Sequence, residues 1–337
     1  MASKPTDKNN YTIDDIAKEL GVSKTTVSRA ISGKGRIGAE TRQKVLEFIE
    51  EHNYRPNAVA KSLAQSKTFN IGLVLPDNHN TDNFSFFQQC MNGICAVASH
   101  RDYDILIAMS GDHSTRQLER ILDNHKVDGI IVTRSVMNSA EIALLKAKDI
   151  PFIIIGYAPE PNMLYVDNDN QAACTELTSL LMEKGTRSFA LLGGDESYYV
   201  TRSRLQGYKD AHVRNGLPVN EELIFMNMND NNDISPAIDK IIQQQTDCII
   251  CMDDVICSLA LIQLQDRGIK IPQDIQIASY YDSNILARSV PCVTSLHFDA
   301  RSLGAAACTL LLDALNDQDV RGGTIPGYEI CLRESTL

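Results

Sequence analysis

Hydrophobic residues near the start of the chain recur every three or four positions, which is the spacing of short amphipathic helices. The first pattern begins at Thr12, which forms a capping-box-like pair with Asp15, and it ends at Gly21. Its apolar positions are Ile13, Ile16, Ala17 and Leu20. The sequence therefore predicts one short helix with a single buried face.

Two more helices are expected directly after it. Ser23 is placed to cap the second helix, and the third covers roughly residues 39–52. The inward positions of the second helix are Val27, Ala30 and Ile31, and those of the third are Val45, Leu46, Phe48 and Ile49. The polar side chains Lys24, Thr25, Ser28 and Arg29 are left pointing outward.

Two helices joined by a glycine-containing turn are typical of the helix-turn-helix, whose second helix enters the major groove of DNA. Arg29 can donate two hydrogen bonds to guanine, and Ser23, Thr26 and Thr41 suit phosphate oxygens. The alternative is an ordinary solvated helical hairpin, in which the basic residues only keep the chain soluble.

From Phe69 onward the pattern changes to short apolar runs that alternate with helical segments. Runs that are apolar on both faces and are joined by helices indicate parallel sheets covered on each side. Two such series follow one another, so the fold class is α/β, with two doubly wound parallel-sheet lobes after a small helical domain. The runs of the first series are NIGLVLP, DILIAM, VDGIIVT and IPFIII, and those of the second are RSFALLGG, TDCIICM and IQIASY.

Ligands of open α/β sheets bind at the carboxyl ends of the strands, so the cleft between two such lobes is the expected binding site. The loops at those ends hold Asp77 and Asn83, the segment 195–201 ahead of Arg204, the segment 252–254, and Tyr281 with Asp282. Arg and carboxylate side chains can hold sugar hydroxyls through charge-assisted hydrogen bonds.

Charge divides the chain in the same place as the hydrophobic pattern does. Residues 1–67 hold 12 Lys and Arg against 8 Asp and Glu, whereas residues 68–337 hold 20 against 35, and the whole chain has a formal net charge of −11. A basic head on an acidic body favours contact with DNA through the head alone.

No apolar run approaches the 18 residues or so of a membrane span, and MASKPTDKNN lacks the apolar stretch of a secretion signal, so a cytoplasmic protein is expected. Cys248 and Cys251 have CxxC spacing but lie in an apolar run, which favours buried thiols over a metal or redox role. We expect no metal, and without a GxGxxG loop no nucleotide cofactor.

The order of motifs in the head resembles that of the LacI/GalR family of bacterial transcription regulators. VSKTTVSRAISG, TRQKV and HNYRPNAVAKSLA follow in one uninterrupted run. The resemblance implies that Lys24, Thr25 and Arg29 read bases in the major groove, and that Tyr54 contacts the DNA backbone. It also implies that Asn57, Ala60 and Leu63 lie at the minor groove, where Leu63 wedges between bases. The complete set of expected DNA contacts is Thr12, Ser23, Lys24, Thr25, Thr26, Ser28, Arg29, Thr41, Tyr54, Asn57, Ala60 and Leu63.

The body is similar to the effector-binding domain of the same family, which in turn resembles periplasmic sugar-binding proteins. DNDNQAACTELTSLLMEKGTRSFALLGG, TRSRLQGYKDA and CMDDVICSLALIQLQDRGIKIPQDIQIASYYD carry this likeness. It makes Arg204 and Asp254 the strongest effector contacts, with Asp282 shaping the cleft. The complete set of expected effector contacts is Asp77, Asn83, Phe86, Arg204, Asp254 and Asp282. SYYD departs from the family's usual glycine and places Tyr280 at a crowded strand end.

These features predict a domain order of 1–56 for the helix-turn-helix, 57–68 for a hinge helix and linker, and 69–337 for the effector domain. Within the effector domain, one lobe is expected over about 69–167 and 298–327, and the other over about 168–297 and 328–337. The chain stops soon after its last strand without a heptad tail, so a homodimer is expected and a tetramer is not.

We expect a transcriptional repressor of carbohydrate-utilisation genes that binds palindromic operator DNA under allosteric control by a small sugar. Maltose or another glucoside is the expected sugar, and a phosphocarrier protein is a further possible partner. The alternatives are a sugar-binding protein without a regulatory role, and a sugar-modifying enzyme that uses Asp253 and Asp254 as acid and base. Adjacent residues on one chain point apart and no nucleophile accompanies them, so we expect no enzyme.

Overall fold

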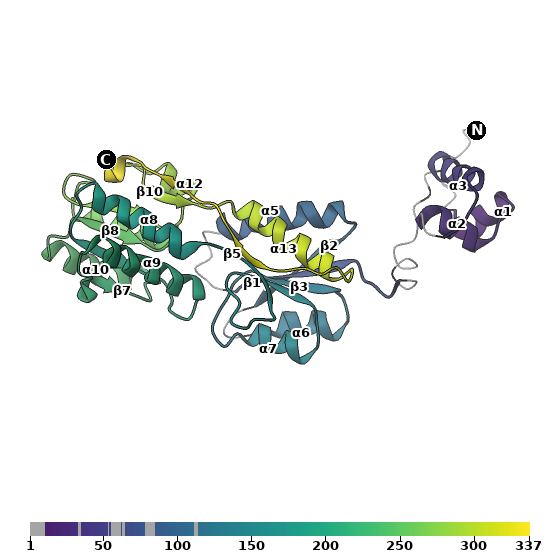
Figure 1. Ribbon diagram of the computed structural model, residues 1–337, viewed down its shortest axis with the longest axis horizontal. Coiled ribbons are helices and arrows are strands. Elements are labelled where there is room, and N and C mark those ends of the chain that lie inside the picture. Colours follow the sequence, from purple (N-terminus) through teal and green to yellow (C-terminus); the bar gives the residue numbers. More distant parts are fainter. Residues whose placement is uncertain are drawn as a thin grey trace, which may run out of the picture. The chain divides into compact units, whose positions relative to one another are not determined.

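The computed structural model describes residues 11–32, 35–52, 54, 62, 65–77, 85–110 and 114–337. The chain forms two compact units, Met1–Lys67 and Thr68–Leu337, called here the head and the body. Figure 1 shows the described helices and strands of each unit. None of the described helices is long and apolar enough to cross a membrane.

The head is built from three helices around one small core. They are α1 (Ile13–Glu19), α2 (Lys24–Ser32) and α3 (Ala39–Glu51). Thr12 and Asp15 form the predicted capping box, and Gly21 follows α1 with a φ of 64°, a conformation that glycine adopts without strain. The buried core side chains are Ile16, Ala17, Val27, Ala30 and Val45.

One inward position predicted for α3 is wrong. Leu46 is 41 % exposed, whereas Val45 is fully buried and Phe48 and Ile49 are partly buried against the same core. Successive residues of a helix are rotated by about 100°, so a helix that buries Val45 turns Leu46 toward its outer side.

The first lobe of the body is a six-stranded parallel sheet in the order β11-β5-β4-β3-β1-β2. Its strands are β1 (Asn70–Pro76), β2 (Asp104–Ser110), β3 (Gly129–Val132), β4 (Phe152–Ile155), β5 (Leu164–Asn168) and β11 (Gly323–Ile325). Its helices are α5 (Ser85–His100), α6 (Arg116–Asp123), α7 (Ala140–Ala147) and α13 (Ala300–Ala314). In Figure 1, α5 and α13 lie side by side over one face, and α6 and α7 lie on the other. Each layer buries its own apolar cluster against the sheet, as a doubly wound fold requires.

The second lobe repeats this plan with the order β12-β10-β9-β8-β6-β7. Its strands are β6 (Phe189–Leu192), β7 (Ile224–Phe225), β8 (Cys248–Cys251), β9 (Gln276–Ser279), β10 (Thr294–His297) and β12 (Glu329–Cys331). Its helices are α8 (Asn170–Glu183), α9 (Tyr199–Asn215), α10 (Asn231–Gln243), α11 (Asp254–Asp266) and the short α12 (Asn284–Ala287), with single 3₁₀ turns at Glu221–Leu223 and Glu334–Thr336. Only the edge strand β12 runs antiparallel among the described pairings.

The described chain passes between the two lobes three times, at 168–170, 297–300 and 325–329. Figure 1 shows the last of these passages as the yellow segment that continues from the first lobe to the carboxyl end in the second. Just before it, Gly322 lies against the backbone of β5, where a Cβ atom would come within 2.1 Å of the Tyr165 carbonyl oxygen. Only glycine fits so close an approach.

The predicted fold class is confirmed by the three-helix head and by the two lobes with parallel sheets. Tyr280, the residue that departs from the family pattern, is fully buried, and its hydroxyl lies 2.5 Å from the hydroxyl of Thr178 in α8. Its ring therefore fills the core of the second lobe beneath α8.

Candidate functional site

A cavity of about 250 Å³ lies between the two lobes of the body and is lined by both. The first lobe contributes Phe86, Phe87, Thr133, Arg134, Ser135, Ile155, Gly156, Asp167, Asn168 and Leu303. The second lobe and the connections contribute Asn170, Tyr198, Val200, Arg204, Asp253, Asp254, Val255, Tyr281 and Phe298. Thr133, Asp253 and Tyr281 follow the strands β3, β8 and β9, so the cavity is at the carboxyl ends of the strands.

Arg204 on α9 is held in place by the protein itself. Its Nε donates to Oδ1 of Asn170 at 3.3 Å, and its Nη1 donates to the Met252 carbonyl oxygen at the end of β8. These bonds fix the guanidinium plane at the wall of the cavity, where it faces the carboxylates of three aspartates.

Those carboxylates are Asp167, Asp253 and Asp254, and each has a pKa shifted upward chiefly because burial disfavours its charged form. The pKa of Asp167 is raised to about 6, and the nearby Arg204 counteracts part of the shift. Burial and the adjacent Asp253 together raise the pKa of Asp254 to about 6. Asp253 caps α11, because its Oδ1 accepts from the Ile256 backbone N–H at 2.8 Å.

Asp254 is 5 % exposed, and its Oδ2 is buried without a hydrogen-bond partner within the described part of the chain. A buried acceptor without a partner costs about 1–3 kcal/mol. Such a group at the wall of a cavity is suited to accept a hydrogen bond from a ligand.

Arg134 lies at the opposite wall in a buried ion pair. Its Nη2 is 3.3 Å from Oε1 of Glu141, and both side chains are at most 7 % exposed. Its Nη1 donates to the hydroxyl of Tyr198 at 2.8 Å, which joins the first lobe to the second.

The backbone also links the lobes beside this ion pair. The Tyr199 N–H donates to the Ser135 carbonyl at 3.1 Å, and the Met137 N–H donates to the Ser197 carbonyl at 2.9 Å. Val136 and Tyr198 form an isolated antiparallel bridge between these two bonds. Residues 135–137 and 197–199 therefore form a short two-stranded contact, called here the interlobe bridge.

Aromatic rings meet across the cavity. Phe86 on α5 and Tyr281 after β9 lie edge to face, with ring centroids 6.0 Å apart. Phe86 also contacts Phe87 in the same way at 5.4 Å. Apolar ring faces beside hydrogen-bonding groups are the usual composition of a sugar or small-molecule site.

The structure brings together three of the predicted effector residues, Phe86, Arg204 and Asp254. Asn83 lies outside the described residues. Asp77 is exposed at the end of β1 and is not among the residues that line the cavity.

Asp282 follows the lining residue Tyr281 and is not itself among the residues that line the cavity. Its carboxylate forms two hydrogen bonds with Arg333, at 2.7 and 3.0 Å, and accepts a third from the Ser295 hydroxyl at 2.6 Å. These bonds hold the pKa of Asp282 below its usual range despite the opposing effect of burial. Asp282 therefore fastens the carboxyl-terminal segment to β10.

Several lining residues were not predicted. Asp167 and Asn168 end β5 and Asn170 follows it, and the half-exposed sequence LYVDN of this strand gave no apolar run. Arg134 comes soon after VDGIIVT, so its position after a predicted strand was a usable signal. The contact between Arg134 and Tyr198 joins residues 64 positions apart and has no local signal.

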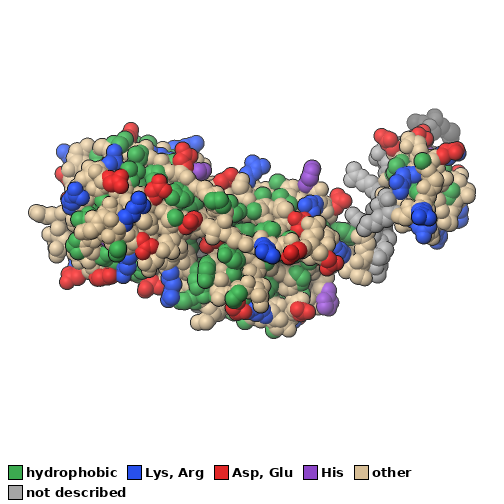
Figure 2. Space-filling model, in the orientation of Figure 1, with side chains coloured by type: hydrophobic (Ala, Val, Ile, Leu, Met, Phe, Trp, Pro, Cys, Tyr) green, Lys and Arg blue, Asp and Glu red, His purple; other side chains and the backbone are tan. Residues whose placement is uncertain are grey.

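In the head, α2 presents a polar surface. Lys24, Thr25, Ser28 and Arg29 are all exposed, and Lys24 forms an ion pair with Asp14 of α1. Figure 2 shows Lys and Arg side chains together with some Asp and Glu on the visible face of the head, and acidic and basic side chains interspersed over the body.

Other predicted DNA contacts have structural partners of their own. Thr12 and Ser23 are both occupied as caps, with Oγ–backbone distances of 3.3 Å to Asp15 and 3.1 Å to Thr26. Thr41 is half-buried in the first turn of α3, and Tyr54 packs partly buried against the head core. Asn57, Ala60 and Leu63 lie outside the described residues.

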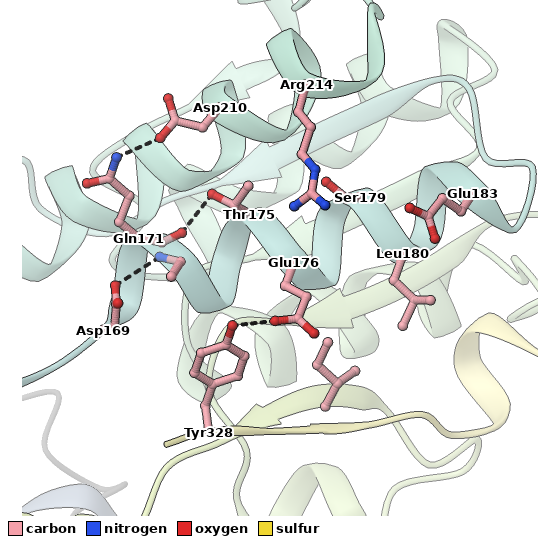
Figure 3. A pocket seen from close by; sticks show the side chains of 12 residues that line it. Asp169, Gln171, Thr175, Glu176, Ser179, Leu180, Glu183, Asp210, Arg214 and Tyr328 are labelled. Carbon is pink, nitrogen blue, oxygen red and sulfur yellow. Dashed lines mark hydrogen bonds between the residues drawn. The ribbon is translucent and has the colours of Figure 1, made fainter. Parts of the chain in front are cut away.

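A larger, open groove of about 630 Å³ lies on the outer side of the second lobe (Figure 3). Its polar groups are bonded to one another: Gln171 donates to Asp210 at 2.6 Å, Asp169 caps α8, and the Tyr328 hydroxyl donates to Glu176. This groove draws only on the second lobe and its terminal strand, so occupancy would not couple to closure of the lobes. The interlobe cavity is the better candidate.

Cys248 and Cys251 are fully buried in β8, as predicted, and burial raises the pKa of both thiols. Among the described residues no cluster of His, Cys, Asp and Glu has the arrangement of a metal site. The CxxC pair therefore packs as part of the sheet.

Sequence and structure comparisons identify relatives over nearly the whole chain. Residues 12–57 match the family described as bacterial regulatory proteins, lacI family, and residues 68–318 match the periplasmic binding proteins and sugar binding domain of LacI family. Catabolite control protein A of Staphylococcus xylosus is 31 % identical over 313 residues, which cover 92 % of this chain and 94 % of the relative.

Solved structures agree with this result. A complex of the transcriptional regulator CelR with cellobiose is 25 % identical, with a TM-score of 0.73 over 96 % of this chain and 99 % of that one. The lac repressor dimer bound to operator and the anti-inducer ONPF is 21 % identical, with a TM-score of 0.77 over 98 % of this chain and 100 % of that one, and it shares the fold. These relatives are DNA-binding regulators and not enzymes. The chain belongs to the LacI family of transcriptional regulators, with a helix-turn-helix head that binds DNA and a body of the sugar-binding type.

Proposed function

We propose that this regulator acts in the cytoplasm as a homodimeric repressor of carbohydrate-utilisation genes, and that a small sugar in the interlobe cavity changes its affinity for a palindromic operator. The observation that carries the proposal is that both lobes line one cavity. A ligand held by both lobes binds more tightly when they are closed, and it therefore shifts the population toward the closed state.

The sugar we propose is a disaccharide, with cellobiose and maltose as the first candidates. A relative 25 % identical was solved with cellobiose, which supports a β-linked glucoside. Phe86 and Tyr281 supply ring faces that could cover a pyranose, and Arg204 and Asp254 supply a donor and an acceptor for its hydroxyls.

On the DNA side, we propose that Lys24, Thr25 and Arg29 read base edges from the exposed surface of α2. A helix in the major groove discriminates through the side chains of its first turns, and these residues occupy that part of α2. The remaining proposed contacts are to the DNA backbone and the minor groove, from Thr12, Ser23, Thr26, Ser28, Thr41, Tyr54, Asn57, Ala60 and Leu63.

The two sites communicate by linkage. If the sugar favours a state of the dimer that binds operator weakly, operator must by the same factor weaken the binding of the sugar. We propose that the coupling has this sign, so that binding of the sugar weakens operator binding and relieves repression. A change of 1–3 kcal/mol in coupling free energy, or about 5- to 150-fold in affinity, is typical.

Fluorescence anisotropy with an operator selected from random duplexes tests this function. We expect preference for a twofold-symmetric site at physiological salt, and weaker binding when cellobiose or maltose is added. Equal binding to selected and random duplexes, with and without every sugar in a broad panel, would contradict the proposal. Adding a phosphocarrier protein to the same assay tests whether that partner assists operator binding.

A further inference from the structure

We propose that the interlobe cavity takes a saccharide without negative charge and excludes phosphorylated sugars. This inference rests on the proposed function of the cavity as the effector site and names the class of effector. It follows from the charges that line the cavity, the capping of the helices that begin beside it and one buried acceptor.

The charged side chains at the cavity do not cancel. Arg134 is paired with the buried Glu141, so its charge is already compensated. Three carboxylates, those of Asp167, Asp253 and Asp254, then remain for the single guanidinium of Arg204. The formal charge of this group is −2, and a like charge brought into a partly buried site is repelled more strongly than in water.

Helix amino termini, which commonly bind phosphate, are already occupied here. Asp253 caps α11 through the Ile256 N–H at 2.8 Å, and Asp169 caps α8 through the Ala172 N–H at 3.1 Å. At the start of α9, the Tyr199 N–H donates to the Ser135 carbonyl of the other lobe. A phosphate would therefore compete with two carboxylates and one backbone carbonyl of the chain itself for these donors.

The buried acceptor is Oδ2 of Asp254, which lacks a hydrogen-bond partner among the described residues. A hydroxyl or an ammonium group of a ligand can donate to it, whereas a phosphate dianion has no proton to donate. Arg204 offers a ligand only its remaining N–H groups, because its Nε and Nη1 donate to Asn170 and Met252.

The test uses three β1,4-linked glucose-type disaccharides that share one backbone and differ in the group that carries charge: cellobiose, cellobiose 6′-phosphate and fully deacetylated chitobiose, which has amines in place of two hydroxyls. Maltose and maltose 6′-phosphate form an α-linked pair for the same comparison. Binding to the full-length protein is measured by titration calorimetry at pH 7.5. We expect the neutral or the amine-bearing sugar to bind at least about tenfold more tightly than its phosphorylated counterpart, since like charges repel more strongly in a partly buried site than in water.

Asp254→Asn and Asp167→Asn each remove one negative charge without changing the size of the side chain. Both variants should reduce the ratio of affinities for the neutral and phosphorylated sugars by about tenfold. Asp319→Asn, at an exposed position that does not line the cavity, should leave this ratio unchanged. In the unmodified protein, raising the salt concentration should reduce the same affinity ratio, because salt screens the repulsion between the phosphate and the carboxylates. This last measurement does not depend on whether a variant folds.

Equal or tighter binding of the phosphorylated sugars would overturn this inference and leave the proposed function intact. Failure of all five sugars and of a broader neutral panel to bind would overturn the proposed function together with the inference. If the phosphorylated sugars bind more weakly, as expected, the affinities of cellobiose and the diamine show whether the effector is neutral or cationic.

Discussion

The carboxylate of Asp254 is suited to ligand binding, and it lowers the stability of the unliganded fold. Burial and the neighbouring Asp253 raise its pKa to about 6, from an ordinary value of 3.8. Folding therefore costs free energy at pH values at which this carboxyl is ionised, and the ionised form is the one that a ligand donor needs. Binding sites commonly hold groups that destabilise the unliganded fold in this way.

Asp254→Asn should therefore stabilise the unliganded body above pH 6. Because the folded-state pKa is raised, the wild-type group is stabilising at pH values below 3.8, and this contribution is lost as the pH rises through 6. The expected gain in the free energy of unfolding at pH 7.5 is at most about 3 kcal/mol, with no gain near pH 4. Thermal unfolding across this pH range measures it. Lower stability of the variant at pH 7.5 would show that the carboxylate is already compensated in the fold.

At the DNA surface, Arg29→Ala should weaken operator binding by about 1–3 kcal/mol and relax the base preference at one position of each half-site. Arg29 is exposed on α2, and its side chain packs on Gly35, so its removal leaves the head core intact. Anisotropy with a set of single-base operator variants measures both effects. Arg214→Ala, an equal charge change on the body, serves as the control. A uniform loss across all operators would instead assign Arg29 to phosphate contact.

At the scale of elements, the interlobe bridge is where a local change should alter closure. Tyr198→Phe removes the hydroxyl that accepts from Arg134 across the lobes and keeps the ring. Hydrogen bonds to charged groups contribute about 1.5–3 kcal/mol, so we expect sugar affinity to fall by about tenfold or more.

Tyr199→Phe is the matched control for this variant. It is the same substitution one residue later and retains the ring contact with Tyr157, whose centroid lies 5.2 Å away. Calorimetric titration of both variants with the sugar that binds the wild type separates the two positions. An equal loss of affinity in both would show that the Arg134 bond has no special part in closure.

Elements with continuous apolar runs could be predicted from sequence, including the edge strand β2, whereas short half-exposed strands could not. NIGLVLP became β1, and DILIAM became most of β2. β5, β7 and β12 are short and half-exposed, so burial left no pattern in them. The same limit applied to the site, because Asp167 and Asn168 end an unpredicted strand, whereas Arg204 and Asp254 lie in segments that carry the family resemblance.

At the scale of the whole molecule, the head and the body have separate cores, and a mutation in one should spare the other. Val45→Ala empties part of the head core, where Val45 is fully buried. Loss of two buried methyl groups costs about 2 kcal/mol, a large fraction of the stability of so small a unit. Operator binding should fall, while the sugar-induced rise in the melting temperature of the body should persist.

Val213→Ala is the control for this change, since Val213 is 81 % exposed on α9 of the body. It should alter neither operator binding nor the thermal shift by a measurable amount. Parallel loss of DNA and sugar binding in Val45→Ala would mean that the two cores do not fold independently.

The triple passage of the chain between the lobes has a consequence for protein synthesis. α13 and β11 complete the first lobe, yet they follow β6 to β10 of the second lobe in the sequence. A ribosome must therefore translate most of the second lobe before the first can close its sheet, whereas the head emerges early and entire. During each round of translation the nascent polypeptide therefore carries a complete helix-turn-helix head well before it carries a complete effector-binding body.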